Sequence, residues 1–153
     1  MDDAAIAGAR AAIDGFLAAF NAEDVQAIQD RWFNFPHVRF ASDKVRVWQT
    51  PADYAANLVW QQRDANKGES AGWARTAFDL VEVIDFGPTK VHFRVHFTRY
   101  RADDSAIGTY KSLYIVTLQD GRWGIQGRSS WAECALPTVA QEYKSAIVLG
   151  MLR

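Results

Sequence analysis

The chain has 153 residues, a length that suits one domain with one core. Its 17 basic and 18 acidic side chains give a net charge of −1, which argues against a nucleic-acid-binding surface, because such a surface needs a basic excess. The only cysteine is Cys134, so no internal disulfide can form, and no apolar run is long enough to span a membrane. The acidic start, MDDAAIAGAR, does not have the pattern of a secretory signal, and we expect a cytoplasmic protein without membrane or nucleic-acid partners.

Two helices are predicted at the start of the chain. In residues 3–20 the apolar side chains recur at helical spacing, with alanine filling much of the rest. The stretch NAED then interrupts this pattern: Asn21 can end the first helix, and Glu23 and Asp24 favour the start of a second. The second helix should end at Pro36, because a proline disfavours helical conformation at the residue before it.

Strands dominate the rest of the chain. Residues 37–42 and 44–49 alternate with a period of two, which is typical of short strands. Thr50, Pro51 and Asp53 form a strong start for a third helix, which should run to about residue 65. Four long strands are predicted at residues 73–86, 90–101, 109–119 and 123–131. This order predicts an α+β domain in which three helices from the N-terminal half pack on one face of a curved antiparallel sheet.

Three stretches of the sequence, FLAAFNAEDVQAI, VWQTPADY and DGRWGIQGRSSW, resemble the nuclear transport factor 2-like superfamily, also called the SnoaL-like or ketosteroid-isomerase-like fold. The resemblance covers roughly residues 5–133 and leaves residues 134–153 as a tail of a single SnoaL-like domain, 1–153. It implies a cone-shaped, cystatin-like sheet around a pocket, and pairing of sheets back to back in homodimers. It implies no single activity, because the superfamily contains isomerases, dehydratases, cyclases, transport factors and binding modules.

Residues 90–100, KVHFRVHFTRY, place two histidines within an apolar strand. His92 and His96 are four residues apart, so their Cβ atoms should lie roughly 13 Å apart. One zinc ion with bonds of about 2 Å cannot easily be held by both, and we expect neither a metal nor another cofactor. The alternation instead places these apolar residues on the concave face of the sheet: Val91, Phe93, Val95 and Phe97.

The outer face of the sheet is expected to form a homodimer. Its predicted contact residues are His92, Arg94, His96 and, from the alternation along the last strand, Arg128. A face of this mixed composition is too large for plain solvent exposure, and arginine and tyrosine are favoured at interfaces. The apolar stretch SAIVLGML in the tail can extend the same interface.

His37 is the candidate catalytic residue of a pocket between the concave face and the helices. The resemblance implies a general base near this point of the chain, and histidine can accept and return a proton near neutral pH. The alternative is that His37 only forms a hydrogen bond to the backbone after Pro36. The isomerase constellation is not reproduced, because the first helix lacks a tyrosine and Ser112 and Tyr114 stand where a buried acid could lie.

Large aromatic side chains are the candidate ligand-binding residues: Trp48, Tyr54, Trp60, Trp73 and Tyr114. They suit a small apolar or aromatic molecule, although core packing is the alternative for each. Arg128 and Ser130 could bind a carboxylate only if they faced the pocket. Two classes of function therefore stay open. The first is a ligand-binding domain, and the second is a cofactor-independent isomerase, dehydratase or cyclase that uses His37 as acid and base. The lack of an acid–base partner for His37 favours the first.

Overall fold

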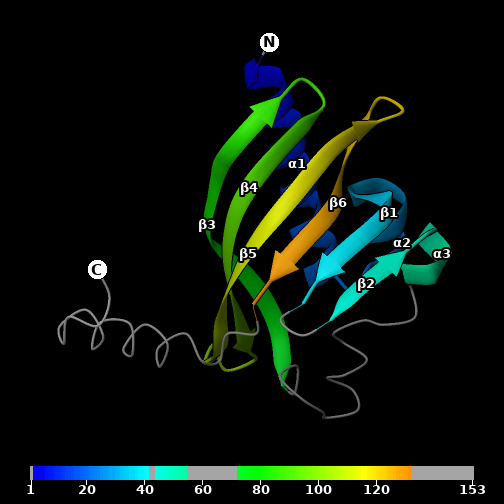
Figure 1. Cartoon of the computed structure of the whole chain (residues 1–153). Coiled ribbons are helices and arrows are strands. Elements are labelled where there is room, and N and C mark those ends of the chain that lie inside the picture. The colour runs from blue at the N-terminus through cyan, green and yellow to red at the C-terminus, as the bar shows by residue number, and fades with distance from the viewer. Residues whose placement is uncertain (1, 42–43, 55–71, 132–153) are drawn as a thin grey trace, which may run out of the picture.

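The computed structural model describes residues 2–41, 44–54 and 72–131. A six-stranded curved sheet in the order β2-β1-β6-β5-β4-β3 carries the long helix α1 along one face (Figure 1). The helical elements are α1 (Asp2–Asn21), α2 (Val25–Ala27), the π-helical turn η1 (Ile28–Trp32) and α3 (Pro51–Tyr54). The strands are β1 (Phe33–Phe40), β2 (Val45–Trp48), β3 (Trp73–Gly87), β4 (Lys90–Arg101), β5 (Ala106–Gln119) and β6 (Arg122–Ser130). The predicted α+β fold class is confirmed, with one difference: β1 pairs with β6 in parallel, and the other pairs are antiparallel.

Helix α1 covers the concave face because one side of it is apolar. Ile13 and Phe16 are buried on that side, and the small side chains of Ala9, Ala12 and Ala19 let the helix approach the strands closely. Asn21 fixes the end of the helix. Its amide donates to the Thr76 carbonyl at 2.8 Å, and its side-chain oxygen accepts the Thr76 N–H at 2.8 Å. Two hydrogen bonds therefore tie α1 to β3.

The second helix is shorter than the sequence predicts. It passes into the π-helical turn η1, and β1 already begins at Phe33. Pro36 lies inside this strand, after a cis peptide bond with Phe35. The pairing of β1 with β6 is irregular between Phe33 and Val38, so the missing N–H of proline interrupts no regular ladder. The prediction that a helix would end at Pro36 and a strand would start after it was therefore wrong at both boundaries.

The remaining elements agree with the pattern of the sequence. Strands β3 to β6 lie within a few residues of their predicted positions, and α3 starts at Pro51. The expected continuation of that helix to residue 65, and the tail of residues 134–153, lie outside the described residues. Within the described part of the chain, no helix is long and apolar enough to cross a membrane.

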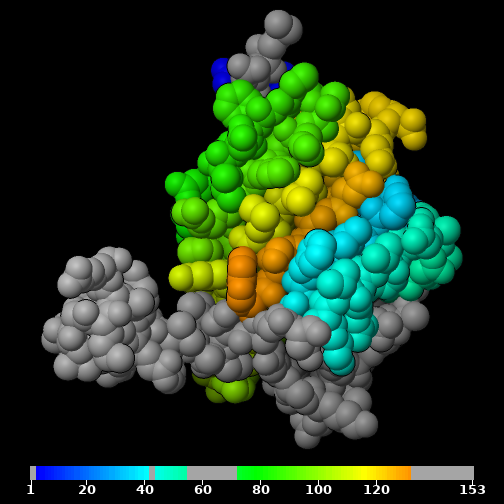
Figure 2. Space-filling model, viewed as in Figure 1, coloured from blue at the N-terminus to red at the C-terminus, as the bar shows by residue number. Residues whose placement is uncertain are grey.

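The two faces of the sheet differ as the alternation in β4 predicts. The predicted concave residues Val91, Phe93, Val95 and Phe97 are all buried in the main core. Figure 2 shows the opposite face, where the strands lie side by side and no described helix covers them. His92, Arg94 and His96 belong to this outer face, since they alternate with the buried residues.

Arg128 departs from the prediction that placed it on the outer face. Opposite β6, Ile115 pairs with Gly127 while the next residue of β5, Val116, pairs with Ile125, so Gln126 is an extra residue. Such a bulge reverses the alternation beyond it. Arg128 consequently lies on the concave side with Ile125, and its assignment to the outer face was wrong.

Candidate functional site

His37 is fully buried where β1 meets β2 and β6, and both of its ring nitrogens have partners. Nδ1 lies 2.8 Å from the carbonyl oxygen of Ile125, which can only accept a hydrogen bond. Nε2 lies 3.1 Å from Nε of Arg128, which can only donate one. The ring is therefore the neutral tautomer with its hydrogen on Nδ1.

The protonation of His37 follows from these surroundings. Burial lowers the pKa of the imidazole well below its usual value, the positive charge of Arg128 lowers it further, and the bond to Ile125 opposes the shift. His37 is thus neutral near pH 7 and is engaged as an acceptor for an arginine. The geometry fits a residue that positions Arg128, and the predicted acid–base role of His37 stays a prediction.

Aromatic side chains enclose this histidine. The ring of Phe33 stacks on it with a centroid distance of 3.9 Å and an interplanar angle of 5°. The predicted ligand-binding residues Trp48 and Tyr54 lie 5.8 and 6.5 Å from the imidazole, centroid to centroid, and both are buried. Tyr54 also receives a hydrogen bond from Arg128, and burial raises its pKa, so its phenol is neutral.

Arg128 connects His37 to a small cavity of about 40 Å³ beneath the C-terminal half of α1. The guanidinium carbon of Arg128 lies 4.9 Å from the ring centre of Phe33 and 5.5 Å from that of Phe16, which are distances for cation–π contact. The side chains that matter most in the cavity wall are Phe16, Phe20, Phe97, Arg99, Tyr114 and Arg128. The wall thus combines aromatic faces with guanidinium groups.

Two further arginines belong to this region. Arg99 lines the cavity and lies over the ring of Tyr110, at 4.9 Å from its centroid. Arg39 is the register partner of Arg128 across the β1–β6 pair. Burial lowers the pKa of Arg39 to about 10, and the charges of Arg128 and Arg99 add to this shift. The three side chains therefore share one electrostatic environment.

Sequence reasoning missed Arg39 and Arg99, although the signal was present. Arg39 follows His37 by two residues and Arg99 follows Phe97 by two, so the alternation that placed those residues inside also places the arginines inside. Arginine is rarely buried, so the residue type alone gives no reason to look for it in a pocket.

The other predicted ligand-binding residues divide into three groups. Tyr114 lines the cavity, is buried, and has a pKa that burial raises. Trp73 is buried as well, but its indole donates to Thr76 at 2.9 Å and its ring packs edge-on against Phe20. Trp73 thus belongs to the core beside the cavity. Trp60 lies outside the described residues.

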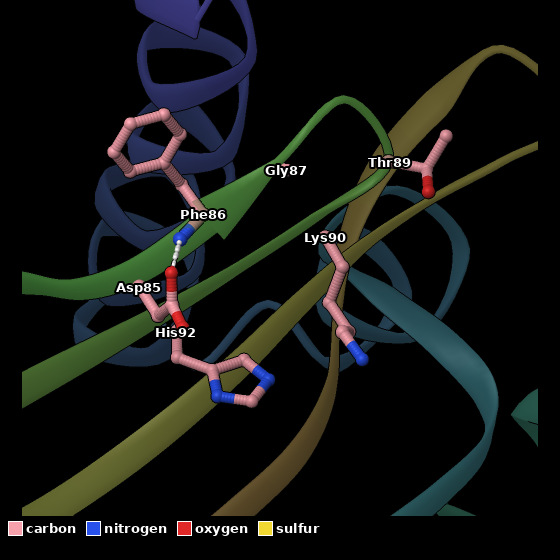
Figure 3. Close-up of a pocket in the computed structure, with 6 residues that line it drawn as sticks. All are labelled: Asp85, Phe86, Gly87, Thr89, Lys90 and His92. Atoms are coloured by element: carbon pink, nitrogen blue, oxygen red, sulfur yellow. Dashed lines mark hydrogen bonds between the residues drawn. The ribbon is translucent and has the colours of Figure 1, made fainter.

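A second hollow, of about 290 Å³, lies at the turn between β3 and β4. Figure 3 shows the side chains of Lys90 and His92 on one side of this hairpin and the ring of Phe86 on the other. Asp85 accepts a hydrogen bond from the Phe86 N–H at 2.8 Å. Among the described residues, no group of three histidine, cysteine or acidic side chains could hold a metal ion, here or elsewhere.

Most of the chain matches a known protein family. The family described as NTF2-like protein (DUF6841) matches residues 4–130. The chain belongs to this NTF2-like family. The nuclear transport factor 2-like resemblance seen in the sequence is thereby confirmed, whereas no curated protein matches the chain.

Solved structures with the same fold are numerous. An NTF2-like protein of unknown function from Pseudomonas putida KT2440 is 18% identical, with a TM-score of 0.63 over 86% of this chain and 89% of its own. A ketosteroid isomerase-like protein from Erwinia carotovora atroseptica SCRI1043 is 17% identical, with a TM-score of 0.59 over 82% and 93%. An NTF-2 like protein of unknown function from Shewanella oneidensis MR-1 is 20% identical, with a TM-score of 0.57 over 78% and 93%. At these identities the likeness carries the fold alone, so the function of this NTF2-like chain depends on its own site.

Proposed function

We propose that the chain is a small-molecule-binding protein whose ligand enters the cavity between α1 and the concave face of the sheet. The observation that carries this proposal is the composition of the cavity wall. Phe16, Phe97 and Tyr114 offer aromatic surface, while Arg99 and Arg128 offer fixed polar groups beside it. Apolar walls with a few convergent polar groups are the usual features of a ligand site.

Catalysis through His37 is the less favoured alternative. A general base must have a free nitrogen within reach of the substrate proton, and here Nδ1 faces the Ile125 carbonyl while Nε2 accepts from Arg128. The lowered pKa of His37 also makes it a weak base near pH 7. The residues that line the cavity in the described part of the chain include no carboxylate that could replace it.

A screen of small apolar and aromatic molecules, neutral and charged, tests the proposal. We expect at least one of them to shift the amide resonances of residues around Phe97 and Tyr114 in nitrogen-15 NMR spectra. Leu17→Trp fills the cavity from α1 and should abolish these shifts. Ala7→Trp, on the exposed side of the same helix, should leave them unchanged. A screen without binders, or shifts confined to another part of the molecule, would contradict the proposal.

We also propose that the chain forms a homodimer through the outer face of the sheet. His92, Arg94 and His96 lie on this face, and Leu113 is the register partner of Arg94 on β5. Apolar side chains continue the face across β1 and β2, where Phe40, Val45 and Val47 are exposed. Exposed apolar side chains gathered on one face are typical of a protein–protein interface.

Light scattering on the purified protein at micromolar concentration tests the dimer. We expect twice the mass of the chain for the wild type and the mass of a single chain for Leu113→Glu, which places a charge within the proposed interface. The control Ala7→Glu adds the same charge to the exposed side of α1 and should stay dimeric. A monomeric wild-type protein would refute the proposal.

A further inference from the structure

Three arginines converge on the concave face of the sheet from three different strands. Arg39 on β1 and Arg128 on β6 are register partners, so their backbones are about 5 Å apart. Arg99 reaches the same region from β4 and lines the cavity together with Arg128. Like charges so close repel one another, and the fold must therefore offset this repulsion elsewhere.

Some N–H groups of these arginines have no hydrogen-bond partner among the described residues. Nε of Arg39 and Nε of Arg99 are shielded from solvent, and neither has a hydrogen-bond partner among the described residues. A buried donor without a partner destabilises the folded protein, and a charged donor does so more strongly. Two such donors on neighbouring charged side chains are the arrangement expected of a site whose partner is a ligand.

Arg128 is by contrast held in place. His37 accepts from its Nε, Tyr54 accepts a further hydrogen bond, and the rings of Phe16 and Phe33 lie within cation–π distance. An arginine has five N–H donors, so these contacts leave others free to bind at the cavity that Arg128 lines. A preorganised guanidinium loses little entropy when a ligand binds.

We propose that the ligand is an organic carboxylate whose charged group lies among Arg39, Arg99 and Arg128. Its apolar or aromatic body would lie against Phe16 and Phe97. This inference rests on the proposed binding function and narrows it to one class of molecule. His37 is then a positioning residue that aims Arg128 at the carboxylate.

The size and shape of the site favour a carboxylate over a phosphate. The cavity of about 40 Å³ has room for a few water molecules, which is comparable to a planar carboxylate group. Guanidinium groups bind carboxylates through two parallel hydrogen bonds, and burial strengthens such charge-assisted bonds. The aromatic rings of Phe16, Phe97 and Tyr114 beside the arginines fit an acid with an apolar body, whereas inorganic phosphate has no apolar part to lie against these rings.

Matched pairs of small molecules test this inference on the full chain. Benzoate, phenylacetate and hexanoate are each compared with the corresponding neutral amide by NMR titration, and inorganic phosphate serves as the competing anion. We expect at least one carboxylate to bind about tenfold or more tightly than its amide, because a charge-assisted hydrogen bond to arginine is lost in the amide. Its resonance shifts should map to Phe97 and Tyr114.

Variants of the arginines provide the second part of the test. Arg39→Met and Arg99→Met should each weaken carboxylate binding by about tenfold or more, and should affect the amide little. Arg39→Lys keeps the charge without the planar fork, so it should bind more weakly than wild type and more tightly than Arg39→Met. Arg10→Met removes an exposed arginine of α1 and should not change the affinity.

Three outcomes would overturn the inference, and each is separable from failure of the proposed function. If amides bind in the cavity as tightly as acids, the chain binds small molecules without selecting a carboxylate. If phosphate binds more tightly than every carboxylate, the arginines serve a phosphate. If acids bind tightly but Arg39→Met and Arg99→Met leave their affinity unchanged, the site lies elsewhere. Failure of the whole neutral and charged screen would instead refute the binding function itself.

Discussion

Three arginines on the outside of the molecule, Arg10, Arg75 and Arg94, lie against carboxylates, whereas the arginines on the concave face of the sheet do not. On the surface, Arg10 pairs with Asp14 at 3.1 Å and Arg75 with Asp104 at 3.2 Å. Inside, Arg39, Arg99 and Arg128 lie near one another and near aromatic rings, without a carboxylate among the described residues that line the cavity. The surface follows the usual rule for charged side chains, and the interior departs from it.

The difference separates arginines that pair with carboxylates from arginines that have no acidic partner among the described residues. Exposed ion pairs add little to stability because water screens them. Buried arginines without acidic partners reduce stability, because burial removes water from a charge and neighbouring charges repel it. If the proposed carboxylate site is correct, these three half-buried arginines lower stability in exchange for binding, and the following substitutions measure that exchange.

The largest effect is expected at His37, which accepts a hydrogen bond from Arg128. His37→Ala removes the ring stacked on Phe33 and leaves the Ile125 carbonyl and Nε of Arg128 without their partners. We expect the free energy of unfolding to fall by about 3 kcal/mol in urea denaturation. His96→Ala, on the half-buried outer face, should cost about 1 kcal/mol or less. Equal losses of stability in the two variants would show that the contacts of His37 stabilise the fold no more than those of His96.

Removing a buried charge should act in the opposite direction. Arg39→Met keeps an apolar chain of similar length but removes a cation that burial and two neighbouring arginines disfavour. We expect the free energy of unfolding to rise by about 1–2 kcal/mol, seen as a higher midpoint in thermal denaturation. If Arg39→Met instead lowers the free energy of unfolding, Arg39 stabilises the fold. The idea that it lowers stability in exchange for binding would then be wrong.

The pH dependence of stability tests the neutral state of His37. Burial lowers its pKa in the folded protein, whereas an unfolded histidine titrates near about 6.5. Below that pH the unfolded chain binds a proton that the folded chain excludes, so acidification favours unfolding, by up to about 1.4 kcal/mol per pH unit from this residue. Above pH 7 the contribution vanishes. In denaturation series from pH 7.5 to 5, wild type should lose stability faster than His37→Asn, and parallel curves would contradict the assignment.

Most of the fold was predictable because alternation along the strands is a long-range signal. In β4 it assigned Val91, Phe93 and Val95 to the core, and apolar residues at helical spacing predicted α1 in a comparable way. The boundaries around Pro36 were not predictable in this way. Whether a proline ends a helix or lies in an irregular strand depends on the pairing of β1 with β6, which is distant in sequence.

The candidate site was only partly predictable for a similar reason. His37, Tyr54 and Tyr114 were identified from the resemblance and from their residue types. The inward position of Arg128 depends on a single extra residue, Gln126, opposite β5, and a one-residue bulge has no mark in the local sequence. Because the alternation was carried through that bulge without a shift, the arginine that organises the site was placed on the wrong face.

The smallest effect is expected on the surface, at the ion pair between Arg10 and Asp14. Arg10→Met breaks the pair with Asp14, whose side chain is 55% exposed. An exposed pair four residues apart on a helix contributes about 0.3–0.5 kcal/mol, and this order, with the cation before the acid, is the less favourable one. We therefore expect a loss of no more than about 0.5 kcal/mol in urea denaturation, and a smaller loss in 1 M salt because ions screen the pair. If Arg10→Met lowered the free energy of unfolding by about 1–2 kcal/mol, the loss would be as large as the gain expected for Arg39→Met. Exposed arginines would then affect stability as much as those on the concave face. Ligand affinity alone would then distinguish the two kinds of arginine, because Arg39→Met should weaken carboxylate binding and Arg10→Met should not.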